Sequence, residues 1–208
     1  MACATYSSEP VARGAEPGPE LPATIERALK VVVTGGFGVG KTTLIGTVSE
    51  IRPLRTEETI TQASIGVDDL SGLENKTQTT VAMDFGRICV SQRTVLYIFG
   101  APGQRRFWHL WSGLTEGAIG ILVLVDTRRL EDSFGVLDQL ELAHNRQPFV
   151  IAVNRFPDTP HHSLEEIRDA LDLEPRVPIV ECDAREMGSA VQSLIDVAEY
   201  ALRLQEGV

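Results

Sequence analysis

The sequence of 208 residues is short of basic side chains, of aromatic residues and of cysteine. Lysine and arginine together number 19, against 29 aspartate and glutamate residues, so the formal net charge is −10 at pH 7. A chain with this charge is a poor match for a nucleic-acid backbone or for an anionic membrane surface. Binding of a small phosphate compound would need a local positive pocket instead.

Few features suggest an oxidising or membrane environment. The three cysteines, Cys3, Cys89 and Cys182, form no CxxC pair, which argues against a disulfide framework or a zinc site and favours the cytoplasm. The longest apolar run, Ala118–Val125, is too short to cross a bilayer. No secretory leader, myristoylation glycine or prenylation box is seen. We therefore expect no direct membrane anchor, so that any membrane recruitment would come through a partner.

The chain divides into a tail and one domain. Residues 1–24 are rich in proline, glycine, glutamate, serine and alanine, and such a segment buries too little apolar surface to offset the cost of ordering it. We expect a flexible tail over 1–24 and a single folded domain over 25–208. That length is enough for a sizeable buried core.

Strand and helix patterns alternate along this domain. Helical patterns start near Lys41 and cover 131–144, Ser163–Leu171 and the last twenty residues, and Ser163 with Glu166 forms a capping box. Several strand patterns are apolar throughout, which predicts an α/β fold whose mainly parallel sheet has helices on both faces. Residues 52–79 are polar, and we expect no regular structure there. The predicted strands are Ala28–Thr34, Thr80–Val90, Thr94–Phe99, Ile119–Val125, Phe149–Val153 and Val177–Glu181.

A glycine-rich segment after the first predicted strand fits the pattern G-x-x-x-x-G-K-S/T over Gly35–Thr42. Glycines let backbone N–H groups surround phosphate oxygens, and the start of the following helix adds a favourable dipole. Lys41 can reach the β- and γ-phosphates, and the Thr42 hydroxyl can take one coordination position of Mg²⁺. The predicted phosphate-binding residues are Gly36, Phe37, Gly38, Val39, Gly40, Lys41, Thr42 and Thr43.

Later segments resemble the Ras superfamily of GTPases in order and spacing. Thr80–Phe85 resembles switch I, Ala101–Phe107 resembles switch II, and Asn154–Asp158 resembles a degraded N-K-x-D base motif. Asp183-Ala184-Arg185 stands where the family has its S-A-K loop. The closest resemblance is to the bacterial Ras-like ATP/GTP-binding proteins of actinobacterial conservons, relatives of the MglA-type gliding-motility GTPases. It implies a Ras-like P-loop fold, bound GTP or GDP with Mg²⁺, and a regulatory partner of the roadblock type.

The resemblance also implies roles for the switch residues. Thr80, or Thr79 in the alternative register, would contact the γ-phosphate and share the metal with Thr42. Gly103 would sense the γ-phosphate through its backbone, and Gln104 would orient the attacking water.

Cationic residues in or near the switches are candidates for stabilising charge in the transition state. Lys41 and Arg105 are the catalytic candidates alongside Gln104. Arg106 is an alternative to Arg105, and Arg52 and Arg55 are rivals in the polar segment.

Base recognition is assigned by the same resemblance. Asn154 would hold the base-binding loop, Asp158 would pair with the guanine N1 and N2 hydrogens, and the Ala184 N–H would meet the guanine O6. The remaining predicted nucleotide-binding residues in these two loops are Arg155, Asp183 and Arg185.

Two departures from the family pattern affect this reading. The usual D-x-x-G is Gly100-Ala101-Pro102-Gly103, so the aspartate that helps to hold Mg²⁺ is missing. Asp84 is not expected to replace it on the metal of Thr80, because four strand residues span ~13 Å. Pro157 occupies the aspartate position of the base motif, so guanine specificity requires Asp158 to shift inward.

The leading hypothesis is a small cytoplasmic GTP-binding switch that hydrolyses GTP slowly. Its switch loops would lie near 55–80 and 101–113. The alternatives are a nucleotide-dependent scaffold with negligible hydrolysis, an ATP-using P-loop protein, and a P-loop kinase, which the switch resemblance disfavours.

Overall fold

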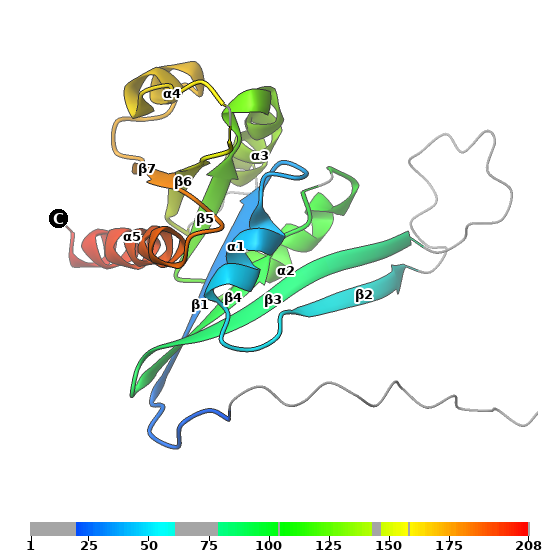
Figure 1. The fold of residues 1–208 in the computed structure, drawn as a ribbon, viewed down its shortest axis with the longest axis vertical. Coiled ribbons are helices and arrows are strands. Elements are labelled where there is room, and N and C mark those ends of the chain that lie inside the picture. The colour runs from blue at the N-terminus through cyan, green and yellow to red at the C-terminus, as the bar shows by residue number, and fades with distance from the viewer. Residues whose placement is uncertain (1–19, 61–78, 104, 143–146, 158, 208) are drawn as a thin grey trace, which may run out of the picture.

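A computed structural model describes residues 20–60, 79–103, 105–142, 147–157 and 159–207. These residues form one seven-stranded sheet in the order β2-β3-β4-β1-β5-β6-β7, with helices on both faces (Figure 1). Residues 1–19 of the predicted tail over 1–24 lie outside the described residues. At its end the Thr24 hydroxyl donates to the Gln92 carbonyl at 2.5 Å.

Five neighbouring strands are parallel, which confirms the predicted fold class. The central strands are fully buried over most of their length, because helices cover both of their faces. This accounts for their continuous apolar sequences. The five strands are β1 (Arg27–Gly35), β4 (Thr94–Gly100), β5 (Gly120–Val125), β6 (Phe149–Asn154) and β7 (Ile179–Cys182).

The other two strands are antiparallel and correct one sequence expectation. The polar stretch 52–79 was expected to lack regular structure, but its residues Leu54–Ile60 form β2. This strand pairs with β3 (Thr79–Ser91), which in turn pairs with β4. A strand at the edge of a sheet is held by backbone hydrogen bonds and needs no apolar run, so composition alone misses it.

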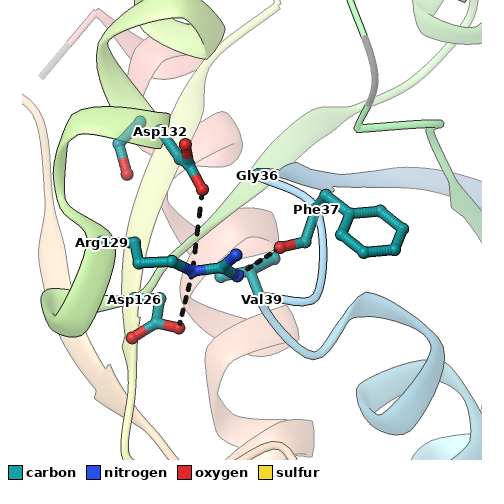
Figure 2. A pocket seen from close by; sticks show the side chains of 7 residues that line it. Gly36, Phe37, Val39, Asp126, Arg129 and Asp132 are labelled. Atoms are coloured by element: carbon teal, nitrogen blue, oxygen red, sulfur yellow. Dashed lines mark hydrogen bonds and ion pairs between the residues drawn. The ribbon is translucent and has the colours of Figure 1, made fainter.

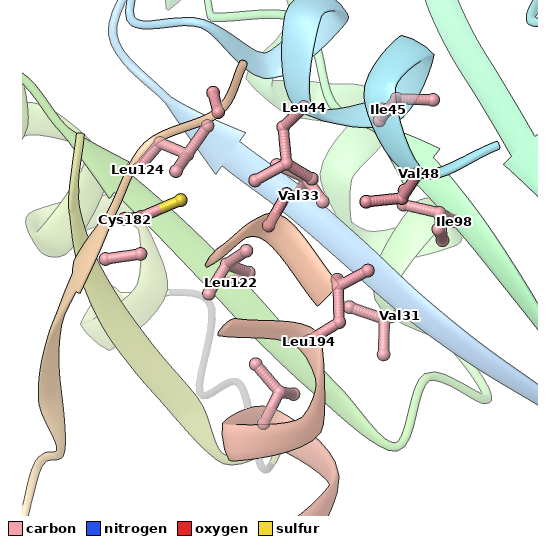
Figure 3. Close-up of a cluster of buried hydrophobic side chains, with 14 of the residues drawn as sticks. Val31, Val33, Leu44, Ile45, Val48, Ile98, Leu122, Leu124, Cys182 and Leu194 are labelled. Atoms are coloured by element: carbon pink, nitrogen blue, oxygen red, sulfur yellow. The ribbon is translucent and has the colours of Figure 1, made fainter. Parts of the chain in front are cut away.

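One face of the sheet is covered by α1 (Lys41–Val48) and α5 (Met187–Glu206). Successive strand residues point to opposite faces, so Val31 and Val33 join this cluster while Val32 joins the other. Figure 3 shows the first cluster, with Leu44 of α1 and Leu194 of α5 meeting the strand side chains. Burial of these apolar groups fixes α1, and with it the loop that precedes α1.

The opposite face is covered by α2 (Trp111–Thr115), α3 (Glu131–Leu142) and α4 (Leu164–Ala170). The predicted capping box before α4 is confirmed, because Ser163 Oγ accepts from the Glu166 N–H at 3.2 Å and the Glu166 carboxylate accepts from the Ser163 N–H at 2.8 Å. Among the described helices, none is long and apolar enough to cross a membrane.

The carboxyl ends of the parallel strands meet at one edge of the sheet. β1 ends at the glycine-rich loop, β5 ends before Asp126, and β6 ends at Asn154. Ligands of open α/β sheets bind at such an edge. The glycine-rich loop, Asp126 and Asn154 therefore lie at the same edge of the sheet.

Candidate functional site

The loop between β1 and α1 has the backbone of a phosphate-binding loop. Gly38 and Gly40 have φ angles of 74° and 109°, in the left-handed region that side chains rarely adopt. A Cβ atom on Gly40 would lie only 2.5 Å from Asn154 Nδ2. The glycines are thus required by both conformation and space, as a cradle of backbone N–H groups demands.

Lys41 begins α1, and its side chain crosses this loop. Its ammonium donates to the carbonyls of Gly35 at 2.9 Å and Gly36 at 2.8 Å. Burial lowers the pKa of Lys41 to about 8, and the nearby Asp84 carboxylate opposes that shift. The group is still mostly protonated at pH 7, so a cation stands where the motif places the β- and γ-phosphates.

The Asp84 carboxylate lies beside Thr42 and opposite Gly100, the position at which the switch II motif has its aspartate. Thr42 Oγ1 donates to Asp84 Oδ2 at 2.5 Å. Asp84 faces Gly100 across the β3–β4 pair, and a Cβ atom on Gly100 would lie 3.1 Å from Asp84 Cβ. The sequence argument compared Asp84 only with Thr80 along their own strand, and it did not predict that the Asp84 carboxylate reaches Thr42 from that strand.

The same strand geometry bears on Thr80, which lies in β3 with its side chain outside the described part of the chain. Four extended residues, ~13 Å, separate it from Asp84. A metal-binding role for Thr80, or for its register alternative Thr79, stays a prediction.

The beginning of the predicted switch II lies against the phosphate loop. A Cβ atom on Gly103 would lie 2.7 Å from the Gly35 carbonyl and 2.9 Å from Lys41 Nζ. The preceding carbonyl, that of Pro102, accepts a hydrogen bond from Trp111 Nε1 at 3.2 Å. Because Phe107 and Trp111 are buried, they anchor this segment in the core. Gly103 is therefore held within contact distance of the loop.

Three further switch candidates cannot be placed as side chains. Gln104 lies outside the described residues, and Arg105 and Arg106 start a short 3₁₀ helix, Arg105–Leu110, with their side chains outside the described part. Of the rival arginines, Arg52 is exposed, and the side chain of Arg55 in β2 is not described. Their catalytic roles stay predictions.

An arginine that sequence reasoning missed forms the outer wall of the phosphate loop (Figure 2). Arg129 Nη2 donates to the Phe37 carbonyl at 2.5 Å, and Arg129 Nε lies 3.7 Å from Asp132 Oδ2. The neighbouring buried carboxylate of Asp126 is bound by Arg128 at 2.7 Å. Burial alone would raise the pKa of Asp126, but its hydrogen bonds with Arg128 outweigh this effect and the pKa is lowered. The available signal was a pair of arginines separated by two residues from the end of a buried strand.

Asn154 links three loops at the base side of the site. Its Nδ2 donates to the Val39 carbonyl at 2.8 Å, and its Oδ1 accepts from the Ala184 N–H at 3.0 Å. Asn154 is itself buried. The Ala184 N–H, predicted to meet a guanine O6, is thus already bound by Asn154, and a base carbonyl would have to share it.

The other base-side candidates pair with each other or with neighbours. Arg185 binds the Asp183 carboxylate through two nitrogens, at 2.7 and 2.8 Å, and Arg155 binds Glu181. Hydrogen bonds from Arg185 lower the pKa of Asp183. Asp158 lies outside the described residues. The Arg155–Glu181 pair joins the segments that follow β6 and form β7, the Arg185–Asp183 pair is local to one loop, and neither identifies a base.

Solved structures share the fold of this chain. The G domain of the FeoB iron transporter from T. maritima matches with a TM-score of 0.57 at 18% identity, over 84% of this chain and 99% of that one. The Arl6 BBS3 small GTPase from Trypanosoma brucei, solved with the nucleotide analogue GppNp, matches with a TM-score of 0.57 at 19% identity, over 85% and 98%. The class of fold is therefore that of a P-loop G domain.

Sequence comparison places the chain more narrowly. Residues 33–204 match the family described as "Conserved hypothetical ATP binding protein", and the chain belongs to this family. No curated protein matches it in sequence. The FeoB G domain from Methanococcus jannaschii is a further structural match, with a TM-score of 0.54 at 12% identity over 84% of this chain and 98% of that one.

Proposed function

We propose that this protein is a small nucleotide-driven switch that binds GTP with Mg²⁺ and hydrolyses it slowly to GDP and phosphate. The observation that carries the proposal is the phosphate loop with the Lys41 ammonium bound across it and the Thr42–Asp84 pair beside it. Backbone N–H groups and an ammonium bind a polyphosphate, and the resemblance of the switch segments to small GTPases favours a switch over a kinase.

The Thr42 and Asp84 oxygens fit Mg²⁺ in chemistry. A hydroxyl and a carboxylate are the hard oxygen donors that Mg²⁺ prefers, and the metal keeps several waters as further ligands. The Asp84 carboxylate accepts a hydrogen bond from the Thr42 hydroxyl, which leaves the oxygen lone pairs of Thr42 for the cation. When bound, the cation would neutralise charge on the β- and γ-phosphates. Thr80 is a further candidate ligand in this proposal.

Hydrolysis in this proposal is in-line attack of water on the γ-phosphorus. The oxygen of water forms the new P–O bond, the bond from the γ-phosphorus to the β–γ bridging oxygen breaks, and the water protons pass to solvent and phosphate. Gln104 would orient the water, Lys41 would stabilise the leaving diphosphate, and Arg105 would add positive charge. Gly103, already against the loop, would report loss of the γ-phosphate to switch II.

The preferred base is either guanine or adenine, and different observations favour each. The resemblance to GTPases favours guanine, with Asp158 as acceptor, together with Asn154, Arg155 and Asp183 to Arg185 in the base loops. The family description favours ATP. Two observations also favour ATP, because each weakens one contact to guanine. The Ala184 N–H is already bound by Asn154, and Pro157 occupies the aspartate position of the base motif.

Equilibrium titration with GTP, GDP and ATP in the presence of Mg²⁺ tests the proposal. We expect GTP and GDP to bind at least tenfold more tightly than ATP. Equal or tighter binding of ATP would contradict the guanine preference and make ATP the proposed nucleotide. Phosphate release separates an enzyme from a scaffold. GTP turnover that is abolished by Gln104→Leu would support hydrolysis. If the protein binds GTP but releases no phosphate, it acts as a nucleotide-dependent scaffold instead.

Signalling would pass through the segments near 55–80 and 101–113 to a regulatory partner. We propose a small roadblock-type protein and a cytoplasmic setting, both on the resemblance stated above. Phosphate release measured with and without such a partner tests this step, and an unchanged rate with no complex formation would contradict it.

A further inference from the structure

We infer that Arg129 is a positioning residue, which sets the orientation of the Phe37–Gly38 peptide so that its N–H faces the bound polyphosphate. The inference rests on the proposed nucleotide function and adds a residue that no motif contains. Arg129 comes from the 3₁₀ turn between β5 and α3 and reaches the outer side of the phosphate loop (Figure 2). Its guanidinium donates to the Phe37 carbonyl at 2.5 Å.

The geometry of a peptide bond links this contact to the inside of the loop. In a trans peptide the C=O and the following N–H point in opposite directions, and the described chain has no cis peptide bond. A donor that holds the Phe37 carbonyl outward therefore turns the Gly38 N–H inward, toward the cradle. A cation on the carbonyl also polarises the peptide, which strengthens the N–H as a donor.

Two carboxylates hold the guanidinium in place. Asp132 Oδ2 lies 3.7 Å and Asp126 Oδ2 lies 4.0 Å from Arg129 Nε. Arg129 also approaches Gly38 closely, because a Cβ atom there would lie 3.2 Å from Arg129 Nη2. Asp126 has its own partner in Arg128, so Asp132 is the carboxylate whose charge Arg129 mainly balances.

Nucleotide affinity is the first test. Arg129→Gln should weaken binding of the preferred nucleoside triphosphate roughly tenfold, the loss expected for one weakened hydrogen bond to a phosphate. Arg176→Gln is the matched control, because Arg176 pairs with Glu174 in the loop between α4 and β7. It should leave the affinity unchanged. Equal affinities for Arg129→Gln and the wild-type protein would overturn the inference.

A double variant separates positioning from simple charge balance. Removal of Arg129 leaves the Asp132 carboxylate near the loop, where a Cβ atom on Gly36 would lie 3.0 Å from Asp132 Cβ. If repulsion by Asp132 caused the loss, Arg129→Gln combined with Asp132→Asn would recover wild-type affinity, and the inference would fail. We expect at least half of the loss, on a logarithmic scale, to persist.

An NMR experiment observes the peptide itself and does not depend on nucleotide binding. Labelling phenylalanine carbonyl carbons with ¹³C and glycine nitrogens with ¹⁵N selects four peptide bonds, which are Phe37–Gly38, Phe85–Gly86, Phe99–Gly100 and Phe134–Gly135. The Gly38→Ala variant identifies the first signal by its disappearance.

In the free protein, Arg129→Gln should shift the Phe37–Gly38 signal while the Phe134–Gly135 signal stays in place. An unmoved Phe37–Gly38 signal would refute the positioning role even if nucleotide affinity changed. If the wild-type protein bound neither GTP nor ATP, the proposed function would fail, and this spectrum would still decide whether Arg129 sets the peptide.

Discussion

The two sides of the site are built from different parts of the chain. On the phosphate side, the contacting groups are mostly backbone atoms of the glycine loop, with Lys41 bound to two loop carbonyls. On the base side they are side chains, and several already pair with each other, as Arg185 does with Asp183. Asn154 joins the two sides through the Val39 carbonyl and the Ala184 N–H.

This difference explains why the phosphate side can be predicted from the sequence more easily than the base side. A backbone cradle needs glycine at fixed positions, so its chemistry leaves a fixed spacing. A base can be bound by many combinations of side chains, so its recognition leaves a weak pattern that a substitution such as Pro157 can blur. We therefore expect substitutions on the phosphate side to have the larger effects on nucleotide binding.

The largest effect is expected for Gly40→Ala. The added methyl group meets Asn154 Nδ2 at 2.5 Å, and the φ of 109° is strained for any residue with a side chain. We expect a loss of nucleotide affinity of ~100-fold or more, since such strain costs about 1–3 kcal/mol before the clash is counted. Isothermal titration calorimetry measures this loss.

Gly113→Ala is the matched control for that variant. Gly113 lies in α2, and a Cβ atom there would meet nothing within 4 Å. Alanine in a helix should raise the free energy of unfolding by about 0.5–1 kcal/mol and leave nucleotide affinity unchanged. A comparable loss of affinity in both glycine variants would mean that the loop geometry is not what binds the ligand.

Asp84→Asn should act on the metal more than on the nucleotide. Replacing the carboxylate that accepts the hydrogen bond from the Thr42 hydroxyl removes one negative charge from the proposed Mg²⁺ site. We expect the Mg²⁺-dependent part of nucleotide affinity to fall ~30-fold, in the range for a hydrogen bond to a charged group. Titrations with Mg²⁺ and with excess chelator measure that part separately. If the nucleotide affinity measured without Mg²⁺ fell as much as the affinity measured with Mg²⁺, a metal role for Asp84 would be contradicted. Asp138→Asn on the exposed side of α3 is the control.

Asn154→Ala should weaken the link between the two sides. The change leaves the Val39 carbonyl and the Ala184 N–H without their partner, which costs about 2 kcal/mol for two neutral hydrogen bonds. Urea unfolding should show this destabilisation, and nucleotide affinity should fall roughly tenfold because the loops lose their relative placement. A protein of unchanged stability would show that the asparagine does not hold these loops.

The smallest effect on the site is expected for Ser163→Ala, at the start of the helix that follows the base loop. Loss of the cap should lower the free energy of unfolding by about 1 kcal/mol. Nucleotide affinity should not change, because α4 contributes no group to the phosphate side. A drop in nucleotide affinity would mean that the start of α4 takes part in the base side of the site, which contradicts this prediction.

Much of the fold could be predicted because buried parallel strands are continuous apolar runs. β5 and β6 fell within a residue of their expected positions for this reason. β2 could not be predicted, since an edge strand such as Leu54–Ile60 depends on pairing with β3 rather than on its own composition.

The phosphate loop was found by spacing, but two neighbours of it were not. Asp84 comes from an adjacent antiparallel strand, and only the register with Gly100 brings it to Thr42. Arg129 lies 92 residues from Phe37 in sequence, and no local pattern relates the two. Contacts of this kind depend on strand order, which the motifs do not contain.

The most direct test of the central claim is a titration of GTP with Mg²⁺ onto the wild-type protein, Lys41→Ala and Lys30→Ala. Lys30 is the matched control, because it donates to the Glu116 carbonyl and lies in the first half of β1, away from the phosphate loop. We predict saturable binding to the wild-type protein and to Lys30→Ala, and a loss of at least ~100-fold for Lys41→Ala. Binding that survives Lys41→Ala undiminished, or a wild-type protein that binds neither GTP nor ATP, would contradict the account.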